Sequence, residues 1–195
     1  MNSLTVKMNA EIKILKLLIS NKEEIFTIKK IAERAKLNYR TAYEKILYLE
    51  KGELIRVIKT GNAKACGFTN KFNKDVFEAE YERRNDLLKN KDFLVLYKRL
   101  SELQFQFITL LFGSHAKGKA GKHSDIDLLT IGGDEKEIRS IISLWPEKIH
   151  LTAITYKDFI HMAKSREFTA VSEAVKNNII LVGIEEYYRL LSNAQ

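Results

Sequence analysis

Apolar positions recur at helical spacing in three consecutive stretches near the start of the chain. Residues 8–20, MNAEIKILKLLIS, carry isoleucine and leucine three and four positions apart, which predicts an amphipathic helix. Residues 27–37, TIKKIAERAKL, predict a second, shorter helix with Thr27 as its N-cap. Residues 39–52, YRTAYEKILYLEKG, predict a third helix, which Asn38 caps. The chain is therefore expected to begin with three short helices.

An alternating pattern follows the third helix. Residues 53–69, ELIRVIKTGNAKACGFT, alternate as a strand, turn at Gly61 and Asn62, and return as a strand. Residues 71–103 are rich in charge, contain neither proline nor glycine, and have helical periodicity. We expect them to form a helical linker between two domains, which comprise residues 1–70 and 104–195.

Strand patterns return after the linker. Residues 105–114, FQFITLLFGS, predict a buried strand that runs into Gly113 and Ser114. Residues 124–131, SDIDLLTI, predict a second strand, and residues 147–155, EKIHLTAIT, predict a third. This mixture of helices and strands places the chain in the α+β class.

Two aspartates occupy one face of the second of these strands. Because side chains alternate along a strand, Asp125 and Asp127 point to the same side, roughly 6–7 Å apart, while Ile126 and Leu128 point into the core. Neighbouring carboxylates repel each other, and a divalent cation relieves that repulsion. Mg²⁺ prefers carboxylate, phosphate and water oxygens, and paired metals can activate an attacking oxygen and stabilise a leaving pyrophosphate.

The loop before this strand suits a phosphate group. Gly113 lets the backbone approach a phosphate without an intervening Cβ, and Ser114 offers an N–H and a hydroxyl. Together with the two aspartates, this loop suits a metal-bound nucleoside triphosphate.

Composition narrows the class of protein. Hydrophobic residues make up 45% of the 195 positions and charged residues 30%, which is typical of a soluble globular protein. The sequence has neither an apolar stretch of the roughly 18 residues that a membrane span needs nor a signal-peptide core, so we expect a cytoplasmic protein without a membrane partner. The single cysteine, Cys66, excludes an internal disulfide and a multi-cysteine zinc site, and is expected to be a small buried side chain.

The net charge of +8 is unevenly distributed. Residues 1–100 contain 22 Lys and Arg against 13 Asp and Glu, whereas residues 101–195 contain 11 against 12. The first half is therefore a candidate for binding a polyanion.

Residues 8–69 resemble the winged helix domains of prokaryotic transcription regulators, in the order of three helices and a basic hairpin. In such domains the third helix enters the major groove of double-stranded DNA and the hairpin, or wing, contacts the backbone. The resemblance implies DNA contacts from the third helix and from the wing; the residues are Asn38, Tyr39, Arg40, Thr41 and Lys45, and Arg56, Lys59 and Lys64. The alternative is a winged helix that serves dimerisation or another protein contact.

Residues 104–191 resemble the minimal nucleotidyltransferases of the DNA polymerase beta superfamily. Their signature has Gly-Ser, any residue, Ala, Arg or Lys, and Gly, then five residues and Ser-Asp-x-Asp-Leu. The chain carries GSHAKG at 113–118 and SDIDL at 124–128, so every signature position and the spacing match. The resemblance implies a mixed, twisted sheet with helices on one side. It also implies that ATP or another nucleoside triphosphate is held with Mg²⁺ or Mn²⁺; the residues are Gly113, Ser114, Lys117 and Ser124 for the nucleotide and Asp125 and Asp127 for the metal.

One feature of the superfamily is missing. Its members usually have a third carboxylate on a neighbouring strand, where it binds metal and acts as a base. Residues 147–155 carry no Asp or Glu in the middle of either face, and His150 or Thr152 stands where the carboxylate is expected. A neutral His150 could act as the catalytic base, but it cannot supply negative charge for a second metal.

Three functions remain open. The first is transfer of a nucleoside monophosphate, AMP being the first candidate, to a hydroxyl of a protein, nucleic acid or small molecule; related small proteins modify a partner toxin. The second is a DNA-binding regulator that senses a nucleotide without turnover. The third is a regulator whose second domain only mediates homodimerisation.

Overall fold

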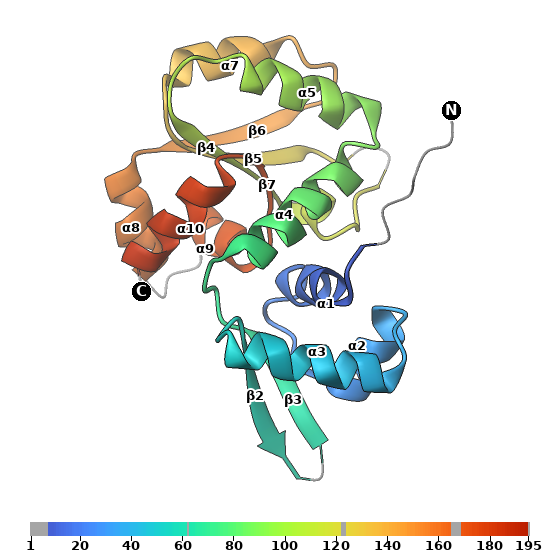
Figure 1. The fold of residues 1–195 in the computed structure, drawn as a ribbon. Helices are drawn as coiled ribbons and strands as arrows, with labels where there is room; N and C mark the ends of the chain where they lie inside the picture. Colours follow the sequence, from blue (N-terminus) through green and yellow to red (C-terminus); the bar gives the residue numbers. More distant parts are fainter. Residues whose placement is uncertain (1–7, 62, 122–123, 165–168, 195) are drawn as a thin grey trace. The chain divides into compact units, whose positions relative to one another are not determined.

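The computed structural model describes residues 8–61, 63–121, 124–164 and 169–194. It divides into two compact units, Met1–Ala79 and Glu80–Gln195 (Figure 1). The boundary between the units falls within helix α4 (Lys74–Leu87).

The first unit alternates helices with an antiparallel sheet. Its elements are α1 (Ala10–Ile19), β1 (Phe26–Thr27), α2 (Ile28–Arg34), α3 (Tyr39–Lys51), β2 (Ile55–Thr60) and β3 (Ala63–Phe68). The strands lie in the order β1-β3-β2, and both neighbouring pairs are antiparallel. The predicted helices and hairpin are therefore present, although Asn62 of the predicted turn lies outside the described residues.

Local hydrogen bonds begin two of these helices where the sequence predicts. The Thr27 side chain accepts from the Lys30 N–H at 3.3 Å and caps α2, and the Asn38 carboxamide oxygen accepts from the Thr41 N–H at 2.8 Å and caps α3. Both cap predictions are confirmed. Strand β1 was not predicted; it forms because buried Phe26 pairs with Cys66 on β3.

The second unit is built on a mixed sheet. Its elements after α4 are α5 (Lys91–Ser101), β4 (Phe107–Phe112), α6 (Gly113–Ala116), β5 (Ile126–Gly132), α7 (Glu135–Ser143), β6 (Ile149–Ile154), α8 (Tyr156–Lys164), α9 (Ala170–Lys176), β7 (Ile179–Val182) and α10 (Ile184–Asn193). The strand order is β6-β5-β4-β7, in which β5 and β6 are parallel and the other pairs are antiparallel. The expected mixed sheet is confirmed.

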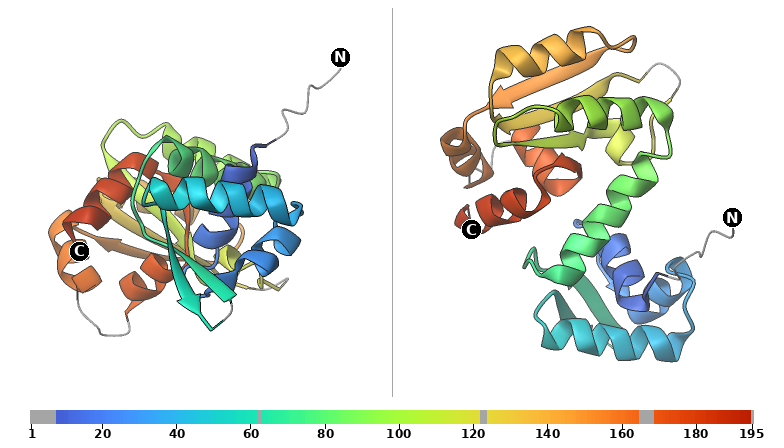
Figure 2. Two further views of the ribbon diagram at one scale, coloured as in Figure 1. Left: turned by 60° about the horizontal axis from the view of Figure 1, so that its bottom comes forward. Right: turned by 45° about the horizontal axis from the view of Figure 1, so that its top comes forward.

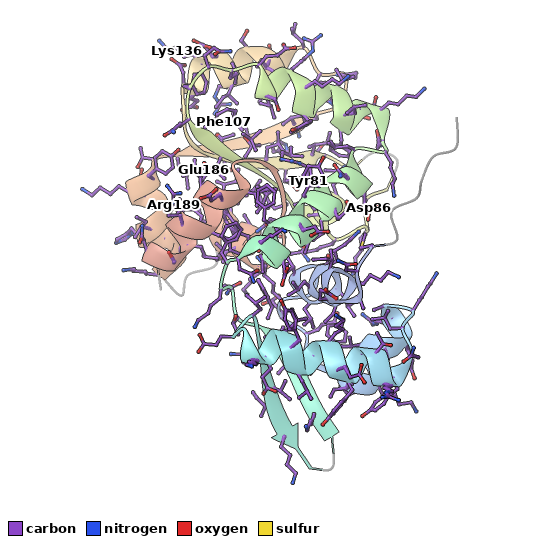
Figure 3. The ribbon with its side chains drawn as sticks, in the orientation of Figure 1. Tyr81, Asp86, Phe107, Lys136, Glu186 and Arg189 are labelled. Atoms are coloured by element: carbon purple, nitrogen blue, oxygen red, sulfur yellow. The ribbon has the colours of Figure 1, made fainter. Side chains whose placement is uncertain are left out.

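Helices cover both faces of this sheet. Helices α5 and α7 pack on one face, where Phe107, Leu111 and Leu128 are buried with them, and α8, α9 and α10 lie on the other (Figures 1 and 2). Phe107 is labelled in Figure 3. The expectation of helices on one side is therefore wrong. The reason is that all six residues of β4 are buried, and a strand that is apolar on both faces needs cover on both.

Helix α5 lies within the predicted linker but belongs to the core of the second unit. Its apolar residues Phe93, Leu96 and Leu100 are buried against the sheet. The charged residues that suggested a linker form the exposed side of an amphipathic helix.

A buried polar network joins α4 to the C-terminal elements of the same unit. Glu80 is fully buried; it accepts hydrogen bonds from the Arg83 guanidinium and, at 2.7 Å, from the Tyr188 hydroxyl. Arg83 also donates to the backbone oxygen of Asn178. Burial, followed by the effect of the Glu80 carboxylate, raises the pKa of Tyr188 well above its ordinary value. The network pairs charges that would be costly if they were buried alone.

In the part of the chain that the structure describes, no helix is long and apolar enough to cross a membrane.

Candidate functional site

The end of β4 approaches β5 closely at a single glycine. Strand β4 pairs with β5 so that Phe112 lies opposite Asp127, and Gly113 then turns the chain into α6 with a φ of +70°. A Cβ at position 113 would lie 2.2 Å from the Asp127 Oδ2 atom. Only glycine fits here, because both the left-handed backbone and the adjacent carboxylate exclude a side chain.

The two aspartates share a face, as the alternation predicted. Asp125 directly precedes β5 and Asp127 lies within it, and their side chains are 40% and 31% exposed. Ile126 and Leu128 point the other way into the core beneath α5 and α7. The carboxylates are therefore held by a rigid strand yet remain open to a ligand.

His150 lies between these two carboxylates. Strand β6 runs parallel to β5 with His150 in register with Asp127, whereas Thr152 pairs two residues further along, with Leu129. The His150 Nδ1 atom is 3.5 Å from Asp127 Oδ1, and its Nε2 atom is 3.6 Å from Asp125 Oδ2. Of the two residues considered for the position of the third carboxylate, His150 is the one that reaches both aspartates.

Lys148 is a member of this cluster that the sequence analysis missed. Its backbone oxygen accepts a hydrogen bond of 2.9 Å from the Ile126 N–H, which fixes it beside the start of β5. Its Nζ atom lies 3.5 Å from Asp125 Oδ2. A search for carboxylates could not find a lysine, but the alternation along β6 places Lys148 and His150 on one face.

The loop residues assigned to nucleotide binding have protein partners. The Lys117 ammonium forms an ion pair of 2.8 Å with Glu173 on α9, and the Ser124 hydroxyl accepts a hydrogen bond of 2.8 Å from the Gly121 N–H. Ser114 is half-buried within α6. Of these four residues, Gly113 lies against Asp127 and Ser114 follows it at the start of α6, whereas Ser124 closes a turn and Lys117 is paired with α9.

The protein provides part of a metal-binding shell. Mg²⁺ accepts carboxylate oxygens as ligands, and the two aspartates present theirs on one face of the strand. Because Gly113 has no Cβ, the Asp127 carboxylate can lie close to the backbone. Among the described residues, no group of three or more His, Cys, Asp or Glu side chains is arranged to hold a metal ion. Asp125 and Asp127 would thus hold a cation only together with phosphate or water oxygens.

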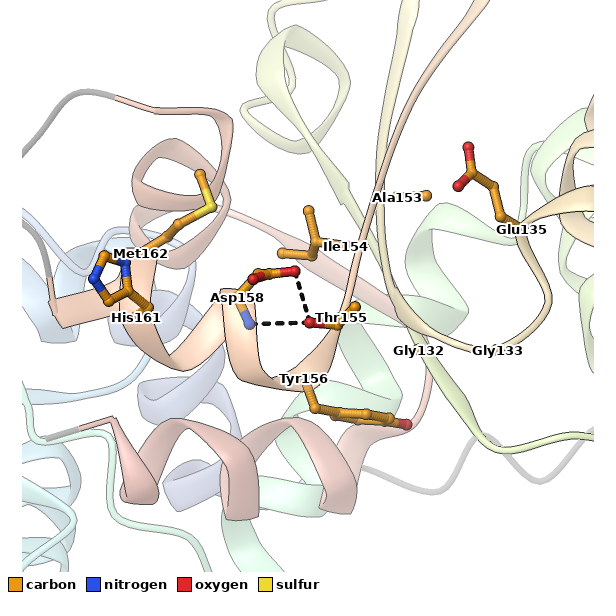
Figure 4. A pocket seen from close by; sticks show the side chains of 10 residues that line it. All are labelled: Gly132, Gly133, Glu135, Ala153, Ile154, Thr155, Tyr156, Asp158, His161 and Met162. Atoms are coloured by element: carbon orange, nitrogen blue, oxygen red, sulfur yellow. Dashed lines mark hydrogen bonds between the residues drawn. The ribbon is translucent and has the colours of Figure 1, made fainter.

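A separate pocket lies at the opposite ends of β5 and β6 (Figure 4). It has a volume of about 440 Å³ and lies where β5 ends and where β6 leads into α8. Its lining residues are Gly132, Gly133, Glu135, Ala153, Ile154, Thr155, Tyr156, Asp158, His161 and Met162. Burial, and then the nearby Glu186, raise the pKa of Tyr156 in its wall. The pocket does not include the paired aspartates, so we place the candidate site at the other end of the strands, where the charged groups converge.

In the first unit, the residues assigned to DNA contact lie on α3 and the β2–β3 hairpin. Tyr39 and Arg40 are strongly exposed on the first turn of α3, and Arg56, Lys59 and Lys64 are exposed on the hairpin. Asn38 uses its side chain to cap α3, while Thr41 is half-buried.

Two of these cations already have acidic neighbours. Arg40 pairs with Glu44 at 2.9 Å, and Lys45 pairs with Glu11 at 3.2 Å. Lys64 instead lies 3.4 Å from the Tyr43 hydroxyl, which joins the hairpin to α3. Residues 1–79 contain 16 Lys and Arg against 9 Asp and Glu, so most of the basic surplus belongs to this unit.

Comparison with known proteins bears on the second unit. Residues 96–187 match the family model described as polymerase beta, nucleotidyltransferase. This match supports the nucleotidyltransferase superfamily for that part of the chain; such enzymes generally use a nucleoside triphosphate and a divalent metal ion. No curated protein and no solved structure gives a significant match to the chain.

Proposed function

We propose that the second unit transfers a nucleoside monophosphate, with AMP as the first candidate, from a nucleoside triphosphate to a hydroxyl group of a protein or other acceptor. The observation that carries this proposal is the contact between Gly113 and Asp127. Glycine at this position lets the Asp127 carboxylate pack against the backbone at the start of α6, so the N–H groups and the hydroxyl that Gly113 and Ser114 could offer to a phosphate come from a turn that touches a candidate metal ligand.

The reaction would exchange one phosphorus–oxygen bond for another. The acceptor oxygen bonds to the α-phosphorus, the bond to the bridging oxygen of the β-phosphate breaks, and pyrophosphate leaves. Bound Mg²⁺ or Mn²⁺ would stabilise the charge that develops on the phosphate oxygens. His150 is the candidate to take the proton of the hydroxyl, because its ring lies between Asp125 and Asp127.

A second function, nucleotide binding without turnover, is favoured by the same histidine. His150 is in register with Asp127 on the strand where we expect the third carboxylate that the superfamily usually has, and it brings no negative charge. In this case the second unit would sense a nucleotide for a regulatory first unit.

Binding of nucleotide and metal is tested by thermal unfolding. Mg²⁺ with a bound nucleoside triphosphate is expected to raise the melting temperature, because a ligand that binds only the folded state stabilises it by mass action. Replacing both aspartates, Asp125→Asn with Asp127→Asn, should abolish the metal-dependent part of that shift. An unchanged melting temperature of the wild-type chain at millimolar nucleotide and metal would contradict both functions and favour a relic that mediates dimerisation.

We also propose that the first unit is a winged helix that binds double-stranded DNA through α3 and the β2–β3 hairpin. Its basic surplus and the exposed Arg40, Arg56, Lys59 and Lys64 support this proposal. When the protein neutralises DNA phosphates, bound counterions are released, so the affinity should fall steeply as salt rises. A plot of the logarithm of the binding constant against the logarithm of the salt concentration should have a slope of about −0.9 for each phosphate contacted.

A substitution on α3 tests whether DNA binds at this helix or is attracted by positive charge anywhere on the protein. Arg40→Ala should weaken DNA binding at low salt, whereas Lys119→Ala, an exposed lysine of the second unit, should leave it unchanged. Equal effects of the two variants, or no binding to any duplex at low salt, would contradict this assignment.

A further inference from the structure

The start of β6 brings positive charge to the place where a second metal ion would need negative charge. Lys148 and His150 face the two aspartates, and Asp125 lies close to both of them. A pair of metal ions shared by carboxylates requires more anionic oxygen than two aspartates provide.

The position of Lys148 is set by the sheet. The hydrogen bond from the Ile126 N–H to the Lys148 oxygen holds its Cα beside the first residue of β5. The flexible side chain then reaches Asp125 from the solvent side, where it is 68% exposed. The ammonium group is therefore free to move between the carboxylate and an anionic ligand bound next to it.

The charges around Asp125 and Asp127 determine how many divalent cations the site can hold. One divalent cation satisfies the two carboxylates together with the oxygens of a bound triphosphate. A second divalent cation beside Asp125 would be repelled by the Lys148 ammonium, and His150 offers it only a neutral nitrogen.

We propose that this site binds a single divalent cation with its triphosphate, and that the Lys148 ammonium takes the place of the second cation by pairing with the phosphate chain. This inference rests on the proposed binding of nucleoside triphosphate at Asp125 and Asp127. It makes Lys148 a ligand-binding residue, because its charge meets the triphosphate directly.

The metal count tests the first half of the proposal. Mn²⁺ bound per chain is measured by electron paramagnetic resonance, with the non-hydrolysable probe α,β-methylene-ATP present in equal amount to the chain. The wild type is expected to bind one Mn²⁺, and His150→Asp, which adds a carboxylate in register with Asp127, is expected to bind two. Two Mn²⁺ ions on the wild type would overturn this inference but leave the proposed function standing, whereas no Mn²⁺ and no probe bound would overturn both.

The affinity for the probe tests the second half. Lys148→Ala should weaken binding of α,β-methylene-ATP about tenfold, since a charge-assisted contact is lost. The same variant should bind Mn²⁺ more tightly when the probe is absent, because a competing positive charge has gone. These opposite changes would not follow from a loss of folding.

Lys136→Ala is the matched control. Lys136 is exposed on the first turn of α7, after the other end of β5 (Figure 3), so both affinities should stay at the wild-type level. If Lys148→Ala behaves like Lys136→Ala in both measurements, Lys148 does not bind the triphosphate and this part of the inference fails.

Discussion

Replacement of Gly113 by alanine tests the site at its tightest point. The new Cβ would lie 2.2 Å from the Asp127 Oδ2 atom, whereas real Cβ atoms essentially never come closer than 3.0 Å, so the oxygen must retreat by at least 0.8 Å. Mg²⁺ demands near-ideal geometry with oxygens at about 2.0–2.1 Å. A displacement of this size should therefore remove Asp127 from the metal shell.

The same substitution also strains the backbone. Gly113 has a φ of +70°, and alanine in the left-handed region costs about 1–2 kcal/mol. A loss of that size would lower the melting temperature by roughly 2–8 °C even if the site were unimportant.

A substitution at Gly118 distinguishes the effect of backbone strain from the effect of displacing the Asp127 carboxylate. Gly118 has a φ of +64°, but an added Cβ there would meet nothing within 4 Å. Gly118→Ala should therefore carry the backbone cost and keep the metal site. We expect both variants to melt lower than the wild type, and only Gly113→Ala to lose the further rise in melting temperature that Mg²⁺ and a triphosphate produce. An equal rise in both variants would refute the close packing of Gly113 and Asp127 as the basis of the site.

Four further predictions concern stability and reactivity outside the nucleotide site. Glu80→Ala should lower the free energy of unfolding by about 3–5 kcal/mol in urea titration, because it removes the carboxylate that balances the charge of the buried Arg83 guanidinium; a loss below 1 kcal/mol would contradict this. Asn38→Ala should lower the free energy of unfolding by about 1 kcal/mol, because the cap of α3 is lost. Asn38→Ser, whose side chain can also cap the helix, should keep most of that stability. Burial raises the pKa of the Cys66 thiol to about 11, so at pH 8 iodoacetamide should alkylate it much more slowly in the native protein than in urea. Above pH 9, the thiol ionises more readily in the unfolded chain than in the folded one, so the free energy of unfolding should decline between pH 9 and 11. Cys66→Ala should lack this part of the decline.

Local patterns predicted much of the fold. Thr27 and Asn38 cap their helices as expected, because a cap depends on residues only three positions apart. Strands β4, β5 and β6 follow from apolar runs and alternation, and alternation alone placed Asp125 and Asp127 on one face.

Relations between distant segments could not be read in the same way. The contact of His150 with both aspartates depends on the parallel register of β5 and β6, which local periodicity does not determine. The ion pair of Lys117 with Glu173 joins residues 56 positions apart, and it occupies a lysine that the signature assigns to the nucleotide. Helix α5 resembled a linker because its charged face is as prominent in the sequence as its buried one.

Use of ATP labelled in the α- or the γ-phosphate tests nucleotidyl transfer most directly. With Mg²⁺ or Mn²⁺ and a cell extract as the source of acceptors, we expect the α-label to become attached to an acceptor while the γ-label leaves as pyrophosphate. Asp125→Asn with Asp127→Asn should show neither product. If ATP and the other three nucleoside triphosphates bind but release no pyrophosphate, the chain is not a transferase and the function of binding without turnover takes its place.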